Sequence, residues 1–258
     1  MLAIYRYAIF AFLKEKLRGV IIHSLLGLSL IMSQHIGAQD ETLSVGFIKA
    51  DRLPYFANKS GDLPVRGLYV DLLDKISQHS GIKFDYQFIP QARIRLYMKN
   101  GLLDIEPGID RSWRLEPKEA ENSVYSIPFM QSKEVIAYNK DKFPNFSLST
   151  PNLSTCAVLG FSQSNVAKDS RILTEVQILN MLQKGRCDSA EFPVDVLKYH
   201  LNKGHPSIRY TQPHSIFSLR LRLHISKKYL LANINNSIRS LLDSGEFEQL
   251  YSRYALTK

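Results

Sequence analysis

Alternating strand-like and helix-like hydrophobic patterns constrain the fold of this chain more than any other feature. Residues 43–47 alternate apolar and polar side chains, as a half-buried strand does. A helical stripe that ends at Gly81 and a second strand follow, carried by Tyr69, Leu72, Leu73, Ile76, Phe84, Tyr86 and Phe88. Pro90 ends that strand, and a short helix over residues 92–100 and a strand at Ile105 are expected next. This order predicts an α/β fold with a largely parallel sheet covered by helices.

The same alternation returns in the second half of the chain. Residues 156–159, 189–192 and 208–210 are strand-like, and two helical stripes stop at Gly185 and Gly204. The clearest strand covers residues 219–225, where Leu and Ile alternate with Arg and His. A helical stripe follows it, formed by Leu231, Ile234, Ile238, Leu241 and Leu242. Between the two units, residues 139–151 are rich in Asn, Pro, Ser and Lys, which is typical of a crossing linker.

The N-terminal segment, residues 1–38, has the pattern of an export signal. Lys14, Lys16 and Arg18 precede an apolar run over residues 19–32, and Ala38 offers a small residue for cleavage before Gln39. The run is shorter than the roughly 20 residues of a membrane-spanning helix. An uncleaved, membrane-anchored helix stays open as the alternative. The prediction is a periplasmic protein.

Charge and residue spacing exclude several function classes. The formal net charge is +9, but no basic run is interleaved with stacking aromatics, so nucleic acid is not an expected partner. The spacing of His200 and His205 matches no metal site, and we find no glycine-rich nucleotide loop. No cofactor and no metal are expected. The two cysteines, Cys156 and Cys187, either form one disulfide in an oxidising compartment or remain buried thiols.

A series of landmarks over residues 63–129 resembles a known family. They are Gly67 to Asp71, Ser80-Gly81-Ile82, Gly101 to Asp104, Arg114 and Ser126-Ile127-Pro128-Phe129. Their order is similar to that in the bacterial extracellular solute-binding proteins of family 3, the periplasmic receptors of polar amino-acid ABC importers. The last strand and helices, with Gly245-Glu246-Phe247, also resemble that family, so the similarity covers about residues 42–255.

The resemblance implies a two-lobe clamshell, the periplasmic-binding-protein-like fold, with two crossover hinge segments and a ligand between the lobes. It divides the chain into a signal peptide (1–38), the first part of lobe 1 (39–138), lobe 2 with the crossovers (139–216) and a return to lobe 1 (217–258). It further implies a monomer without enzymatic activity that binds a small polar, carboxylate-bearing solute, such as an amino acid. The expected partner is the permease of an inner-membrane ABC transporter.

In the family, an arginine shortly before the Ser-x-Pro motif holds the carboxylate of the ligand, and Arg114 occupies that place. A guanidinium suits this role because its planar fork matches a carboxylate. The spacing from Gly108 is one residue short, so Arg111 competes for the role. A salt bridge from Arg114 to Glu116 or Glu119 is the structural alternative.

Other candidate ligand contacts follow from the resemblance. Tyr55 and Trp113 line the cleft or fill the core, whereas Arg93 would join Arg111 and Arg114 in an electropositive pocket for an anionic ligand. Arg95 is expected at the surface.

In the second lobe, Ser162 and Ser164 follow a strand and either bind an anion or cap a helix. Family members that bind amino acids carry an Asp eight residues after a glycine that corresponds to Gly185, but that position is Pro193 here. Glu191 and Asp195 are the nearest substitutes for holding an ammonium group. This departure weakens the expectation of a standard amino acid.

Two other functions remain open. An enzyme on the same scaffold, similar to cyclohexadienyl dehydratase, would need a carboxyl group in the cleft as general acid or base, with Glu191 first and Glu106 second. A ligand-sensing receptor domain would pass lobe closure to a membrane partner.

Overall fold

The computed structural model describes residues 41–158, 171–172 and 174–254. The predicted export signal over residues 1–38 lies outside this part of the chain. None of the described helices is long and apolar enough to cross a membrane.

In the part of the chain that the structure describes, ten strands join one mixed sheet. Its order is β2-β1-β3-β10-β5-β8-β6-β7, with β4 paired to β10 and β9 paired to β5. The strands are β1 (Thr42–Ile48), β2 (Lys83–Ile89), β3 (Ile105–Ile109), β4 (Ser123–Tyr125), β5 (Met130–Asn139), β6 (Thr155–Val158), β7 (Arg171–Ile172), β8 (Ser189–Pro193), β9 (Ile208–Tyr210) and β10 (Ser215–His224). The α/β class is as predicted. The expectation of a largely parallel sheet is only partly right, because β10 and β5 pair with their neighbours in antiparallel fashion.

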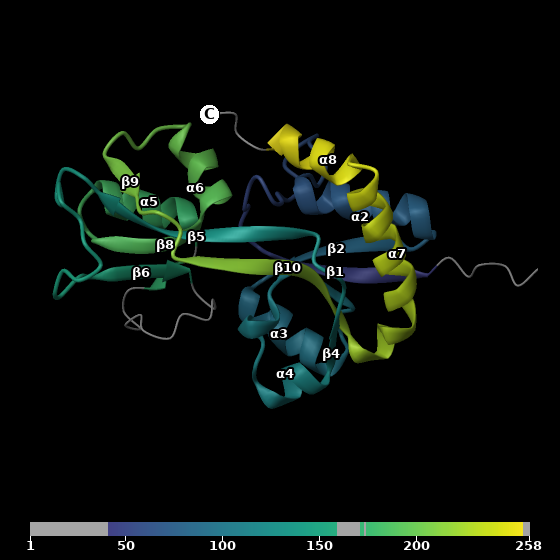
Figure 1. Cartoon of the computed structure of the whole chain (residues 1–258). Helices are drawn as coiled ribbons and strands as arrows, with labels where there is room; N and C mark the ends of the chain where they lie inside the picture. Colours follow the sequence, from purple (N-terminus) through teal and green to yellow (C-terminus); the bar gives the residue numbers. More distant parts are fainter. Residues whose placement is uncertain (1–40, 159–170, 173, 255–258) are drawn as a thin grey trace, which may run out of the picture. The chain divides into compact units, whose positions relative to one another are not determined.

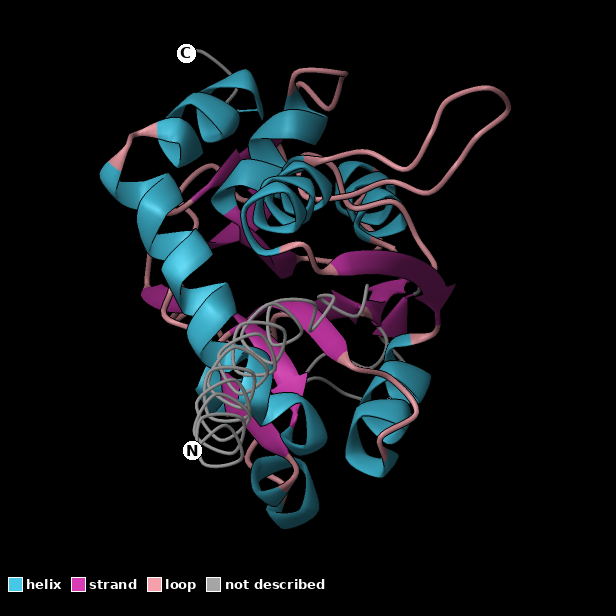
Figure 2. Cartoon of the chain, turned by 90° about the vertical axis from the view of Figure 1, so that its right-hand side faces the viewer, coloured by secondary structure: helices cyan, strands magenta, loops and turns pink. Residues whose placement is uncertain are grey.

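Helices lie on both sides of the strands (Figures 1 and 2). Gly81 ends α2 with a left-handed conformation (φ 75°), as the sequence predicted, and Thr174 caps α5 by accepting a hydrogen bond from the Gln177 N–H. The helices are α2 (Leu68–Ser80), α3 (Gln91–Asn100), η2 (Arg111–Trp113), α4 (Pro117–Glu121), α5 (Glu175–Gln183), α6 (Val194–Leu201), η4 (Ile225–Leu230), α7 (Leu231–Asp243) and α8 (Glu246–Tyr254).

Among the described residues, the buried apolar side chains form two clusters. The larger cluster joins β1, β3, α2, α3 and α7, and the smaller one joins β6, β8 and α5. We call the elements around the larger cluster the first lobe and those around the smaller cluster the second lobe. Each lobe has a parallel βαβ arrangement, in which β1 pairs with β2 and β3, and β6 pairs with β7 and β8.

Strands β5 and β10 run side by side through both lobes (Figure 1). The second half of β10 pairs with β3 in the first lobe, and the second half of β5 pairs with β8 in the second lobe. The prediction that residues 139–151 cross between lobes is therefore wrong. That segment folds onto the second lobe, where Phe146 stacks on Tyr138 with 4.2 Å between ring centroids and Lys142 pairs with Asp188. The exact lobe boundaries stay a prediction.

Candidate functional site

A cavity is lined by residues from both lobes. It lies beside the carboxyl ends of β1, β3, β6 and β8, where open α/β sheets place their ligands. Its volume is about 160 Å³, close to the ~150 Å³ that accommodates a benzene-sized molecule. The cavity is therefore of a size for one small solute.

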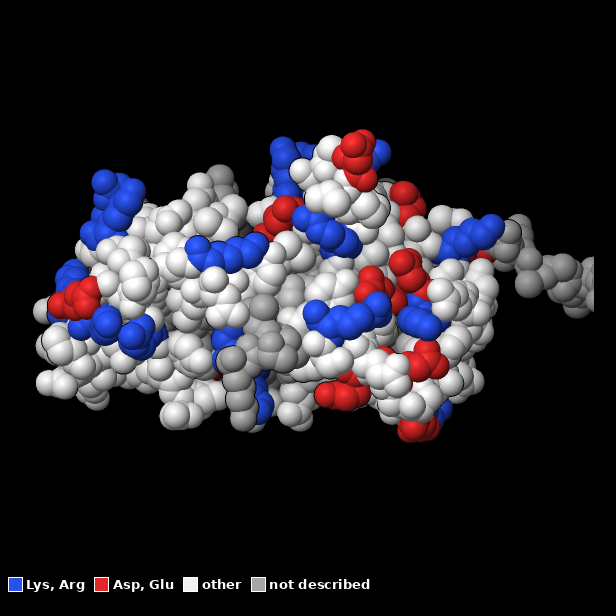
Figure 3. All heavy atoms as spheres, turned by 90° about the horizontal axis from the view of Figure 1, so that it is seen from above, with Lys and Arg blue, Asp and Glu red and all other residues white. Residues whose placement is uncertain are grey.

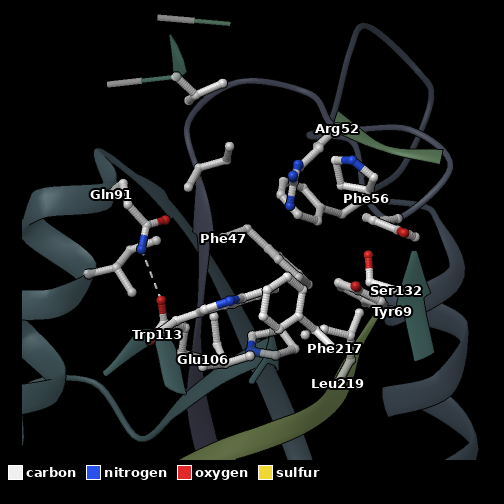
Figure 4. Close-up of a pocket in the computed structure, with 18 of the residues that line it drawn as sticks. Phe47, Arg52, Phe56, Tyr69, Gln91, Glu106, Trp113, Ser132, Phe217 and Leu219 are labelled. Carbon is white, nitrogen blue, oxygen red and sulfur yellow. Dashed lines mark hydrogen bonds between the residues drawn. The ribbon is translucent and has the colours of Figure 1, made fainter. Parts of the chain in front are cut away.

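Aromatic rings form much of the cavity wall (Figure 4). Phe47 stacks on Phe56 at 4.5 Å between ring centroids, and Trp113 meets Phe217 edge-on at 5.0 Å. Tyr69 packs so closely on Gly108 that a Cβ there would lie 2.4 Å from the Tyr69 ring, and Gly108 has a φ of +74°. Only glycine suits this position, because it needs both the space and the left-handed backbone.

Arg114 reaches the cavity, but a carboxylate of the same lobe already holds its guanidinium. Its Nη2 donates to Oε1 of Glu106 at 2.6 Å, its Nε donates to Oε2 at 3.2 Å, and its Nη1 donates to the Trp113 carbonyl. Both side chains are buried. Arg114 thus forms a salt bridge, as the structural alternative expected, but its partner is Glu106 and not Glu116 or Glu119.

Glu106 is the centre of a buried ionic network. It accepts further hydrogen bonds from Arg222 Nη1 at 2.8 Å and from Gln91 Nε2 at 3.0 Å, the latter drawn in Figure 4. Burial alone would raise its pKa, but the charges and hydrogen bonds of Arg114 and Arg222 lower it to about 2. Such a carboxylate stays ionised and is unsuited to act as a general acid near neutral pH.

The network extends from Arg222 on β10 to Glu119 on α4. Arg222 is 0% exposed and also reaches Glu119, which in turn accepts hydrogen bonds from Arg95. Arg95 was expected at the surface, but it is half-buried because α3 packs against α4 and brings it onto this carboxylate.

A second arginine lines the cavity from the first lobe and bonds to the second. Arg52 Nε donates to Oε1 of Glu175 at 2.6 Å, and the Glu175 side chain is 3% exposed. Burial alone would lower the pKa of Arg52, but the charge and hydrogen bond of Glu175, the first residue of α5, raise it. The pair therefore links the two lobes at the edge of the cavity.

Two more glutamates line the cavity from the crossing strand β5 and from β8. Glu134 is 6% exposed and accepts a hydrogen bond from Ser132 Oγ at 2.6 Å. Burial raises its pKa. Glu191 lies 2.8 Å from His214 Nε2. Glu134 pairs with Pro193, and Ile136 with Glu191, so both carboxylates project from the same face of the sheet.

Some of the predicted ligand contacts line the cavity and others do not. Tyr55, Trp113, Arg114 and Glu191 line the cavity. Asp195 instead accepts hydrogen bonds from Tyr251 at 3.1 Å and Tyr55 at 3.5 Å, away from the lining. Ser162 and Ser164 lie outside the described residues. Which of the lining residues hold a ligand stays a prediction.

The structure does not bring Arg93, Arg111 and Arg114 together at this cavity. Arg93 is exposed on α3, and Arg111 lies over the Tyr125 ring at 5.3 Å, so neither lines the cavity. Arg114 is neutralised by Glu106.

Cys156 and Cys187 form a disulfide with Cα atoms 6.1 Å apart in the second lobe. Among the described residues, no group of His, Cys, Asp and Glu is placed to hold a metal ion.

Five residues line the cavity that no sequence pattern had indicated: Arg52, Gln91, Glu134, Glu175 and Phe217. One signal was available for Glu134. It stands between Ser132 and the apolar run from Val135, directly after the Ser-x-Pro-Phe motif, where a charged residue in a strand suggests a special role. Arg52 and Glu175 are 123 residues apart, and no local pattern joins them.

A known protein family matches most of the chain. The model of the bacterial extracellular solute-binding proteins, family 3, matches residues 44–257. A comparison with curated protein sequences gives no match.

Solved structures share the fold. One is a substrate-binding protein of an ABC uptake transporter from Streptococcus pneumoniae with bound histidine (17% identity, TM-score 0.70, 84% of this chain and 95% of that one). Another is the ancestral amino acid-binding protein AncCDT-1, a precursor of cyclohexadienyl dehydratase (19%, 0.69, 89% and 100%). A third is a histidine kinase sensor domain with similarity to periplasmic binding proteins (17%, 0.69, 83% and 95%).

Proposed function

Because the chain belongs to the bacterial extracellular solute-binding proteins of family 3, we propose that it captures a small solute between its two lobes and delivers it to an ABC importer. The observation that carries this proposal is the cavity itself. Its walls come from both lobes, and the Arg52–Glu175 pair joins the lobes at its edge. A solute there would contact both lobes and favour their closed arrangement.

The periplasm and the permease partner are part of the proposal. Structures with a similar fold include substrate-binding proteins of amino-acid ABC transporters. The N-terminal pattern of three basic residues, an apolar run and Ala38 favours export. The disulfide between Cys156 and Cys187 suits an oxidising compartment.

We propose binding without catalysis. Of the two carboxyl groups suggested for an enzyme, Glu106 is held ionised by two arginines. Glu191 is engaged by His214. The raised pKa of Glu134 is the observation that keeps an enzyme as the second candidate, because a general acid needs such a shift.

The single tryptophan of the chain provides the test. Trp113 lines the cavity, so its emission should change when a solute binds. Purified mature protein would be titrated with amino acids, amines, dicarboxylates and small aromatic acids. A saturable change with one stoichiometric solute, recovered unaltered by mass spectrometry, supports capture. Conversion of the solute would favour the enzyme instead, and no saturable change with any solute would contradict the proposal.

Import is tested separately in cells. A strain without the chain should lose uptake of the solute that the titration identifies, and the chain supplied from a plasmid should restore it. Normal uptake together with loss of a transcriptional or behavioural response would favour a receptor.

A further inference from the structure

We propose that the outer end of the second lobe, where β5 ends at the left of Figure 1, binds an anionic lipid surface. This inference goes beyond solute capture and does not depend on the identity of the solute. It rests on a group of basic residues, the outer basic cluster, and on apolar side chains beside it. The cluster consists of Lys140, which is half-buried, and of Lys142, Lys184, Arg186 and Arg209, which are exposed.

The fold gathers the outer basic cluster from three segments of the chain. The last residue of β5 donates two hydrogen bonds from its side-chain amide to carbonyls in the last turn of α5. Lys142 Nζ donates to the Gly185 carbonyl at 3.3 Å, in the turn that also carries Lys184 and Arg186. On β9, Arg209 lies beside the end of β5, with which this strand pairs. These contacts make the cluster one continuous surface.

The carboxylates described at this end of the second lobe are engaged within the protein. Asp188 is buried, pairs with Lys142 and accepts hydrogen bonds from the N–H and Oγ of Ser154. Asp141 accepts a hydrogen bond from Ser207 Oγ. Figure 3 shows the result on the face in view, where Lys and Arg prevail over the second lobe at the left and acidic side chains gather over the first lobe. An anionic surface is therefore attracted to the second lobe.

Exposed apolar side chains beside the cluster favour lipid as the occupant. In the loop after β5, Phe143 meets Phe146 edge-on at 6.1 Å, and Phe146 stacks on Tyr138. Leu148 follows in the same loop and is 60% exposed, and Tyr210 on β9 is 37% exposed. Basic side chains attract the phosphates of anionic lipids, and neighbouring apolar side chains enter the boundary of the acyl chains. An acidic protein surface would engage the charges but would give Leu148 no comparable environment.

The position of the cluster is compatible with solute capture. The cavity lies beside the carboxyl ends of β6 and β8, whereas the cluster lies at the opposite end of these strands, where Tyr138 pairs with the first residue of β8. None of the five cluster residues lines the cavity. A molecule attached to lipid through the cluster would therefore keep its cavity accessible to a solute.

Co-sedimentation with lipid vesicles tests this inference on the mature protein. At physiological salt, the protein should bind vesicles of phosphatidylcholine that contain about a third phosphatidylglycerol, and should not bind vesicles of phosphatidylcholine alone. The triple variant Lys140→Gln, Lys184→Gln, Arg186→Gln should bind the anionic vesicles at least about tenfold more weakly. Leu148→Ser should weaken binding severalfold, because it removes an apolar side chain from the contact.

A control for total charge is needed because the chain carries a formal net charge of +9. The triple variant Lys59→Gln, Lys118→Gln, Lys228→Gln removes the same charge from exposed positions of the first lobe. It should weaken binding by less than about twofold, since salt screens charges that lie more than about 10 Å from the lipid surface. Circular dichroism would establish that each variant is folded.

Three outcomes would overturn the inference and leave solute capture untouched. The first is that the parent protein does not bind the anionic vesicles. The second is equal weakening in the two triple variants, because net charge alone would then explain the binding. The third is retention on immobilised poly-glutamate without binding to vesicles, which would assign the cluster to an acidic protein instead of lipid.

Discussion

Nη2 of Arg114 lies 2.6 Å from Oε1 of Glu106, and both side chains are almost fully buried. The arginine that the family resemblance assigned to a ligand carboxylate is therefore neutralised by a carboxylate of its own lobe. Its principal contact is thus within the protein. Arg114 also donates a hydrogen bond to the carbonyl of Trp113, which lines the same cavity.

Replacing Glu106 should destabilise the protein strongly. Glu106→Gln leaves the charges of Arg114 and Arg222 buried without their shared carboxylate, and breaking a buried ion pair from one side costs about 3–5 kcal/mol. Urea unfolding at pH 7 measures this loss in the free energy of unfolding. The matched control is Glu116→Gln, since Glu116 is exposed and pairs with Lys99 at 3.5 Å, and its loss should stay below about 1 kcal/mol. Equal losses in the two variants would contradict a central role for Glu106.

The same carboxylate should make stability depend on acid pH. The pKa of Glu106 falls from 4.5 to about 2 in the folded protein, so its contribution is complete above the unfolded value. That contribution is lost as pH falls from about 4.5 towards 2. Unfolding free energies measured across this range should therefore decline less steeply in Glu106→Gln than in the parent protein. Identical slopes would show that Glu106 is not held ionised.

Local patterns predicted much of the fold, and long-range contacts account for what they missed. The helix that ends at Gly81 and the strand at residues 219–225 follow from hydrophobic spacing and glycine stops, which act within a few residues. The expected partners of Arg114 were Glu116 and Glu119, which follow it closely in sequence. The packing of β3 against β10 and of α3 against α4 instead places Glu106 on Arg114 and Glu119 on Arg95, with Arg222 in contact with both carboxylates.

The candidate site was harder to predict for the same reason. Glu134 is a charged residue next to Lys133 in a strand, so the local sequence suggests a side chain that faces solvent. In the folded chain Glu134 is buried, within a strand that pairs with both β8 and β10. The Arg52–Glu175 pair depends on how the lobes meet, which no local pattern specifies.

Removing that inter-lobe pair should weaken ligand binding. Glu175→Gln takes away the carboxylate that holds Arg52, so the closed arrangement becomes less favourable relative to the open one. The dissociation constant of the solute, measured by calorimetry, should rise at least about tenfold. Glu248→Gln, an exposed control, should leave it unchanged. An unaltered constant in Glu175→Gln would argue that the pair plays no part in closure.

Reducing the disulfide should lower stability. Cys156 and Cys187 are 31 residues apart, and a loop of this length is expected to contribute about 3–4 kcal/mol. Urea unfolding with and without a reductant measures the difference. The double variant Cys156→Ser, Cys187→Ser should be insensitive to the reductant. Two reactive thiols in the oxidised, denatured protein would contradict the pairing.

A crystal structure of the mature protein with its tightest-binding solute tests solute capture most directly. We expect the solute in the cavity that both lobes line, with Arg114 still paired to Glu106. A solute carboxylate seated on Arg114, with Glu106 displaced, would contradict it.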